Sequence, residues 1–144
     1  MSLAEIVEVL GGGRTFEKPV LKTDDLVARV RAGLPASTVT MLAEVLSMQR
    51  GQVAKRLNIP ERTLSRRLAT KSRLTHDESD RTLRMARVVA LANEVLGSEE
   101  KASRWMVAPN RALAGRPPFD QLDTELGVRS VEEVLQRIAY GMYS

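Results

Sequence analysis

Apolar side chains recur at spacings of three and four along most of this 144-residue chain, which predicts amphipathic helices and no strand. Capping residues precede these stripes and glycine or proline follows them, so the pattern separates into segments. The last helix is expected to begin at Ser130, which forms a capping-box pattern with Glu133. The other expected elements are helices over 2–10, 23–32, 37–46, 75–96 and 98–107, two helices inside 50–68, and a short turn near 119–122.

Aromatic residues make up only 3% of the chain and apolar residues 43%, so the core must consist mainly of Leu, Val, Ile, Ala and Met. Such a core suits packed helices better than a β-sandwich, and we expect an all-α fold. The absence of cysteine excludes disulfides and thiol chemistry. One histidine leaves too few ligands for a zinc site, so we expect no metal and no cofactor.

The polar residues include no catalytic constellation, so we expect no enzyme. His76 stands alone at the start of a helix, where a solvated position is expected. The segment 11–14 lacks the Gly-Lys-Ser/Thr ending of a phosphate-binding loop. Three acids in the Pro- and Gly-containing stretch have no partner histidine and are expected to cap helices: Asp120, Asp123 and Glu125.

The first ten residues carry Glu5 and Glu8 instead of the basic start and apolar run of a signal peptide. No apolar stretch approaches the roughly 20 residues that span a bilayer. We therefore expect a cytoplasmic protein without membrane contact.

Residues 50–68 have the pattern of a helix-turn-helix. Ala54 is the small residue that lets the second helix cross close to the first, and Asn58 suits the left-handed conformation of the turn. Pro60 stands at the start of the second helix, where a backbone N–H would have no partner within the helix, so its absence costs no hydrogen bond. Apolar residues flank the turn and continue along the inner face of the second helix: Leu57, Ile59, Leu64 and Leu68.

Positive charge is concentrated around this motif. Residues 49–87 contain eleven Lys or Arg and four acidic residues, a net charge of +7, whereas the rest of the chain sums to −3. This distribution indicates a polyanionic partner, and together with the motif it favours double-stranded DNA. The alternative is a solvated basic face on a structural pair of helices.

The predicted DNA-binding residues lie on the outer face of the second motif helix and just beyond it, beginning at Glu61. Arg62 and Arg66 are one turn apart and are expected to reach guanine edges or phosphates. Thr63 and Ser65 suit phosphate contacts. Three further basic residues are expected to follow the DNA backbone: Arg67, Lys71 and Arg73.

The motif resembles the Cro/repressor-like (Xre) class of helix-turn-helix proteins, with Gln52 near the start of the first motif helix. The resemblance implies a Cro/repressor-like helical bundle. Arg67 departs from this class, whose members often carry an apolar residue there, and the departure is expected to shift the inner face onto Leu68.

A second set of positions follows at fixed spacings in the C-terminal third: Trp105, Pro109, Asn110, Ala112, Leu113, Gly115, Pro118, Leu122, Asp123, Thr124, Gly127, Val131, Glu132, Leu135 and Gly141. These positions resemble the C-terminal domain of the Xre/MbcA/ParS antitoxin family over about residues 98–144. With the upstream motif, the resemblance extends over 37–144. It implies a helix-turn-helix DNA-binding domain (37–97) and a small helical toxin-binding domain (98–144), preceded by an N-terminal helical segment (1–36).

Members of that family pair with a RES-domain toxin that consumes NAD⁺. The resemblance implies that the C-terminal region covers the entrance of the toxin's active site. It also implies that the complex binds promoter DNA and represses its own operon, and that the antitoxin is an oligomer, here expected to be a homodimer. Two alternatives remain: a free-standing helix-turn-helix transcription factor whose tail only dimerises, and a helical adaptor that binds no DNA.

The end of the chain carries the expected toxin contacts. Both tyrosines lie within the last five residues, and Tyr and Arg are favoured anchors at interfaces. The candidates are Arg129, Arg137, Tyr140, Met142, Tyr143 and Ser144. A frayed end that packs on its own domain is the alternative. Trp105, the single tryptophan, is expected to anchor the core of this domain, and the helices at 2–10 and 24–31 are candidates for oligomer contacts.

Overall fold

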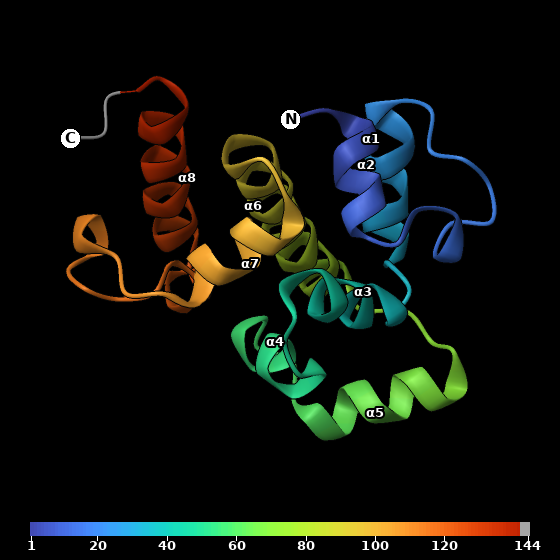
Figure 1. The fold of residues 1–144 in the computed structure, drawn as a ribbon. Coiled ribbons are helices and arrows are strands. Elements are labelled where there is room, and N and C mark those ends of the chain that lie inside the picture. The colour runs from blue at the N-terminus through green and yellow to red at the C-terminus, as the bar shows by residue number, and fades with distance from the viewer. Residues whose placement is uncertain (142–144) are drawn as a thin grey trace.

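The computed structural model describes residues 1–141, and within them the chain forms eight α-helices, three short 3₁₀ turns and no β-strand (Figure 1). The expected all-α fold is confirmed. None of the described helices has the length and apolar character needed to cross a membrane. The helices are α1 (Leu3–Val9), α2 (Thr23–Ala32), α3 (Ser37–Leu46), α4 (Arg50–Arg56), α5 (Glu61–Thr70), α6 (His76–Leu96), α7 (Glu99–Val107) and α8 (Glu125–Ala139). The 3₁₀ turns are η1 (Gly12–Arg14), η2 (Arg111–Leu113) and η3 (Pro118–Gln121), the last at the turn expected near 119–122.

Hydrogen bonds at the helix starts explain why several helices begin where the sequence predicts. The Ser2 hydroxyl accepts from the Glu5 amide at 3.2 Å, and the Glu5 carboxylate accepts from the Ser2 amide at 3.1 Å. This reciprocal pair is a capping box. Thr75 and Glu78 form the same pair at the start of α6, and the Ser98 hydroxyl caps α7. These three expected starts are confirmed.

The last helix begins at Glu125 and not, as the sequence predicts, at Ser130. Its N-cap is Thr124, whose hydroxyl accepts a hydrogen bond from the Gly127 amide at 3.0 Å. Gly127 lies in the first turn of α8, where any added Cβ would overlap the carbonyl oxygen of Gln121. The glycine therefore permits α8 to pack closely on η3 and does not end a helix.

The long helix α6 forms the centre of the molecule. It packs against α1, α2, α3, α7 and α8 (Figure 1), and Met85, Ala86 and Val89 belong to its buried face. The Ser79 hydroxyl on α6 accepts a hydrogen bond from the Leu34 amide at 2.8 Å. The N-terminal helices are thus docked on the same bundle as the rest of the chain.

The C-terminal part also contacts the first helix of the motif. Arg56, the last residue of α4, lies over the Phe119 ring with its guanidinium carbon 5.5 Å from the ring centroid, and its Nη2 is 3.5 Å from Oδ1 of Asp120. Trp105 on α7 is half-buried against the core, whereas the adjacent Met106 is fully buried. One continuous hydrophobic core therefore extends from α1 to α8.

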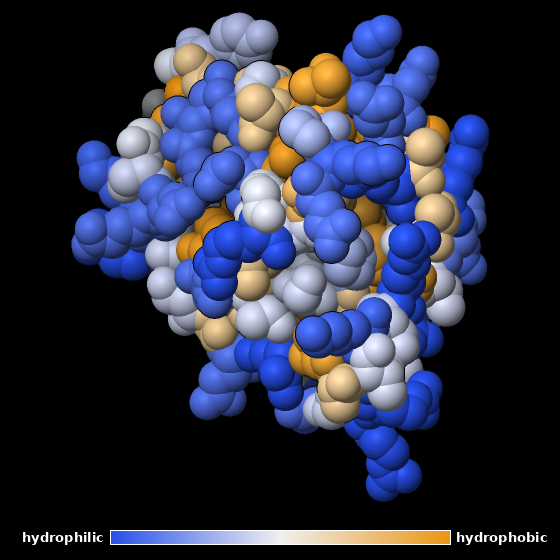
Figure 2. All heavy atoms as spheres, turned by 90° about the vertical axis from the view of Figure 1, so that its right-hand side faces the viewer, coloured by the Kyte–Doolittle hydropathy of each residue, from blue (hydrophilic) through white to orange (hydrophobic). Residues whose placement is uncertain are grey.

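The face formed by α2 and the segment before it is mainly hydrophilic, and its apolar residues form small separate patches (Figure 2). The apolar sides of α1 and α2 face the core, where Val9, Leu26 and Val30 are buried. An interface between copies on this face would therefore be largely polar. The oligomer contacts expected at 2–10 and 24–31 stay a prediction.

Candidate functional site

The turn between α4 and α5 has the geometry of a helix-turn-helix. Ala54 is fully buried, and Asn58 adopts the left-handed backbone conformation with φ 59°. The Ile59 amide donates to the Ala54 carbonyl at 2.9 Å, which closes the turn against α4. Leu57 and Leu64 are buried on the inner side of the motif. The geometry predicted for this turn is confirmed.

The outer face of α5 is exposed and basic. Arg62, Ser65 and Arg66 are exposed, and their spacing of three and four residues places them on one side of the helix. Thr63 is half-buried beside them, and Glu61 is exposed in the first turn. The structure thus gathers these five predicted DNA-binding residues on and beside one helical face.

Two further predicted DNA-binding residues follow the end of α5. Lys71 is the exposed C-cap and adopts a left-handed backbone with φ 55°. Arg73 is also exposed, and its backbone forms an antiparallel bridge with Pro35. This bridge fixes the segment after α5 against the residues that precede α3.

Arg67 differs from the other predicted DNA-binding residues. Its guanidinium forms an ion pair with the carboxylate of Glu78 on α6, and both side chains are largely buried. The expectation that Arg67 follows the DNA backbone is therefore corrected, because this guanidinium is directed into the protein. Leu68 beside it is half-buried and packs against the core.

The surroundings of Glu78 keep its carboxylate charged. Burial alone would raise the pKa of Glu78, but the hydrogen bond from the Thr75 amide at 2.8 Å and the Arg67 guanidinium outweigh this effect and lower the pKa below its ordinary value. At neutral pH the ion pair therefore ties α5 to the start of α6.

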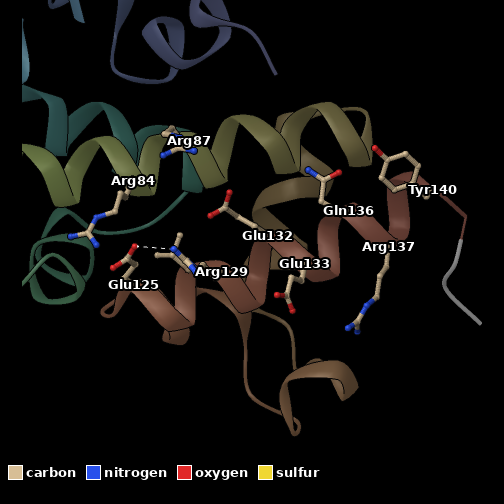
Figure 3. A pocket seen from close by; sticks show the side chains of 10 residues that line it. Arg84, Arg87, Glu125, Arg129, Glu132, Glu133, Gln136, Arg137 and Tyr140 are labelled. Carbon is tan, nitrogen blue, oxygen red and sulfur yellow. Dashed lines mark ion pairs between the residues drawn. The ribbon is translucent and has the colours of Figure 1, made fainter. Parts of the chain in front are cut away.

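A groove of about 630 Å³ between α6 and α8, which we call the α6–α8 groove, brings together three of the predicted toxin contacts (Figure 3). Arg129, Arg137 and Tyr140 line it from α8, and Tyr140 is 75% exposed. Arg84 and Arg87 line it from α6. The remaining predicted contacts lie outside the described residues: Met142, Tyr143 and Ser144.

Ion pairs hold two of the four arginines of the α6–α8 groove. Arg129 lies 3.6 Å from Glu125 and Arg84 lies 3.6 Å from Asp80, in each case one turn away on the same helix. The groove arginines that form no ion pair within residues 1–141 are Arg87 and Arg137.

The sequence places Arg84 and Arg87 in the basic block around the helix-turn-helix, whereas in the fold they line the groove with α8. Their spacing of three residues indicates that the two arginines share one face of the helix, and this much could be predicted from the sequence. The identity of the helix opposite depends on tertiary packing, which no local pattern encodes. Because α5 and α8 lie on opposite sides of the molecule (Figure 1), the basic block is divided between two surfaces.

The acidic residues and the histidine are dispersed over the described part of the chain. Among residues 1–141 no three His, Cys, Asp or Glu side chains converge as ligands for a metal ion. His76 is exposed in the first turn of α6, and Asp120 and Glu125 are engaged with arginines.

Comparisons with known proteins divide the chain within α6. Residues 25–87 match a family profile described as the antitoxin Xre-like helix-turn-helix domain. Residues 91–141 match one described as the antitoxin Xre/MbcA/ParS C-terminal toxin-binding domain. The two matches cover both surfaces described above.

Similar proteins are found among curated relatives and solved structures. The chain is 36% identical to antitoxin Xre of Pseudomonas putida over 127 residues, which cover 85% of this chain and 77% of that protein. It is 33% identical to antitoxin Xre of Photorhabdus laumondii over 132 residues, which cover 91% of this chain and 89% of that protein. A chain in the crystal structure of the M. tuberculosis MbcT–MbcA toxin–antitoxin complex is 26% identical with a TM-score of 0.57, and the alignment covers 76% of this chain and 96% of that one.

Proposed function

The chain belongs to the Xre/MbcA/ParS family of antitoxins, and from this membership we propose that it neutralises a RES-domain toxin that consumes NAD⁺. In this proposal the C-terminal region covers the entrance of the toxin's active site. A homodimer of the antitoxin also binds promoter DNA and represses its own operon. The protein acts by binding its partners and not by catalysis.

One observation carries this proposal: the chain presents two separate surfaces on one helical bundle. In Figure 1 α5 and α8 lie on different sides of α6; α5 carries the exposed basic face, and the groove lies between α6 and α8. A DNA duplex at α5 therefore leaves the groove open for a protein partner.

The exposed face of α5 supports the DNA-binding half of the proposal. Arg62 and Arg66 present guanidinium groups of the kind that pair with guanine O6 and N7 in the major groove or with phosphates. Ser65 and Lys71 suit contacts with phosphates. The other proposed DNA contacts are Glu61, Thr63 and Arg73.

The α6–α8 groove supports the toxin-binding half. Tyr140 is largely exposed although it is aromatic, and Tyr and Arg are frequent anchors at protein interfaces. The proposed toxin contacts are Arg129, Arg137, Tyr140, Met142, Tyr143 and Ser144.

Coexpression with the gene next to the antitoxin gene, which the proposal expects to encode a RES-domain toxin, tests the toxin-binding half. We expect the two proteins to co-purify and the antitoxin to stop NAD⁺ depletion. Removal of residues 140–144 should relieve inhibition and leave DNA binding intact, because α5 lies on the other side of the molecule. A truncated protein that still neutralises the toxin fully contradicts the role of the tail. A full-length protein that leaves NAD⁺ depletion unchanged favours the free-standing transcription factor.

Gel shifts on the DNA upstream of the gene test the other half. The logarithm of the binding constant should fall linearly with the logarithm of the salt concentration, by roughly 0.9 for each phosphate contact. The double variant Arg62→Gln/Arg66→Gln should lose specific binding, whereas Arg104→Gln, at an exposed arginine on α7, should keep it. Failure of the full-length protein to shift this DNA at any salt concentration favours the helical adaptor.

A further inference from the structure

The two walls of the α6–α8 groove come from different parts of the chain. The α8 wall lies within residues 91–141, which match the toxin-binding domain. Arg84 and Arg87 lie within residues 25–87, which match the helix-turn-helix domain. In the fold these two arginines line the same groove as Arg129 and Tyr140 (Figure 3).

We propose that the toxin-binding surface continues across the groove onto α6, so that Arg84 and Arg87 contact the toxin and not the DNA. The occupant of the groove is a segment of the RES-domain toxin that carries both basic and acidic side chains, with a carboxylate placed at Arg87. This inference rests on the proposed function and extends it, because α6 lies within the helix-turn-helix match up to residue 87.

The acidic residues of the groove favour a protein over DNA as its occupant. Glu125, Glu132 and Glu133 line the groove together with the arginines. A phosphate backbone laid in this groove would be repelled by three carboxylates, whereas the outer face of α5 carries only Glu61. Alternating charges of both signs suit the polar side chains of a protein surface.

Arg87 is the arginine of α6 that is best placed to meet a partner. It is exposed and forms no ion pair within residues 1–141, whereas Arg84 is half-buried and close to Asp80. A guanidinium group binds a carboxylate through two parallel hydrogen bonds, and this geometry selects acidic side chains. Arg87 therefore contributes the principal contact from α6, with Arg84 beside it.

The position of the groove allows both partners to bind at once. In Figure 1 α8 lies on the far side of α6 from α5, so the helix that forms one wall of the groove and the helix proposed to bind DNA are presented on different sides of the molecule. The proposed repression by the toxin-bound antitoxin requires this arrangement.

Full-length Arg87→Glu and Arg104→Glu proteins provide a matched test. Both arginines are exposed and both substitutions change the net charge equally, but Arg104 does not line the groove, and its pair with Glu100, at 3.8 Å on the same helix, is exposed to solvent. Two dissociation constants are measured, for the RES-domain protein encoded beside the antitoxin gene and for the operon DNA at one fixed salt concentration. We expect Arg87→Glu to weaken toxin binding at least about tenfold, while its DNA affinity stays within about twofold of Arg104→Glu. Arg104→Glu should bind the toxin as the unmodified protein does.

The inference is overturned if Arg87→Glu binds the toxin normally, if both variants lose toxin affinity equally, or if Arg87→Glu loses DNA affinity beyond the control. If the unmodified protein does not bind the RES-domain protein, the proposed function falls, and the inference with it. Thermal unfolding checks that each variant is folded. Arg87→Gln, which retains a good helix-forming residue, decides the question if the charge reversal prevents folding.

Discussion

Two neighbouring arginines on α5 have opposite surroundings. Arg66 is exposed on the outer face, whereas Arg67 is paired with Glu78 and largely buried. Consecutive residues of an α-helix point about 100° apart, so one residue can face solvent while the next meets a neighbouring helix. Arg66 is therefore available to a partner, whereas Arg67 holds α5 to α6, although the two side chains are chemically the same.

We predict that Arg66→Gln lowers the salt dependence of DNA binding and that Arg67→Gln does not. Loss of one phosphate contact reduces the slope of log binding constant against log salt concentration by roughly 0.9. Arg67 instead orients α5 through Glu78, so its loss should weaken binding at every salt concentration with an unchanged slope. Binding titrations at several salt concentrations measure both effects, and an equal drop in slope for the two variants would place Arg67 on the DNA.

The Glu78 carboxylate should stabilise the fold in a pH-dependent way. Because its pKa is lower in the folded protein than in the unfolded chain, its contribution is complete above the unfolded value of about 4.3 and disappears as the pH falls through the folded value. We expect Glu78→Gln to lower the free energy of unfolding by about 1–3 kcal/mol at pH 7 and by less at pH 3.

Urea denaturation of the unmodified protein and of Glu78→Gln at the two pH values measures this difference. Glu17→Gln, at an exposed carboxylate, is the control and should leave the midpoint unchanged at both. An equal loss of stability at pH 7 and pH 3 would show that the charge of Glu78 has no part in the effect.

At the scale of elements, the start of α8 depends on one close approach. Gly127→Ala would place a methyl group on the carbonyl oxygen of Gln121, and relief of this overlap requires α8 to move away from η3. We expect the substitution to lower the free energy of unfolding by about 1–3 kcal/mol or more.

Gly13→Ala is the matched control, because an added Cβ there meets no atom within 4 Å. Denaturation midpoints of the two variants check the prediction. A stability loss at Gly13 as large as that at Gly127 would show that glycine-to-alanine replacement, and not the overlap, is responsible.

The elements also show which features are readable from sequence. Capping pairs and apolar spacing are local, so the starts of α1, α6 and α7 and the turn at Asn58 follow from a few neighbouring residues. The start of α8 is mispredicted at Ser130, because Gly127 in its first turn is required by the close carbonyl of Gln121 on another element. Arg67 likewise pairs with Glu78 on the next helix, and Arg87 lines a groove whose other wall, α8, lies far along the chain. Tertiary contacts of this kind have no periodic signal in the sequence.

At the scale of the whole molecule, α6 joins all parts of the fold into one core. Helices from both ends of the chain pack on it. In addition, the ion pair between Arg56 and Asp120 links α4 to η3. We therefore predict a single cooperative unfolding transition for the full chain. Trp105, the only tryptophan, reports on the C-terminal part, and circular dichroism reports on all helices. The two denaturation curves should coincide, and separate midpoints would contradict the shared core.

The central position of α6 also bears on how such antitoxins exchange partners in evolution. The boundary between the two family matches, at residues 87–91, falls inside this helix and not in a linker. A gene fusion made there would join two half-helices whose buried residues had been selected against different neighbours. Recombination could combine the toxin-binding part of one antitoxin with the DNA-binding part of another. Such an exchange must therefore keep α6 whole, or the residues that pack on both sides of α6 must change with it.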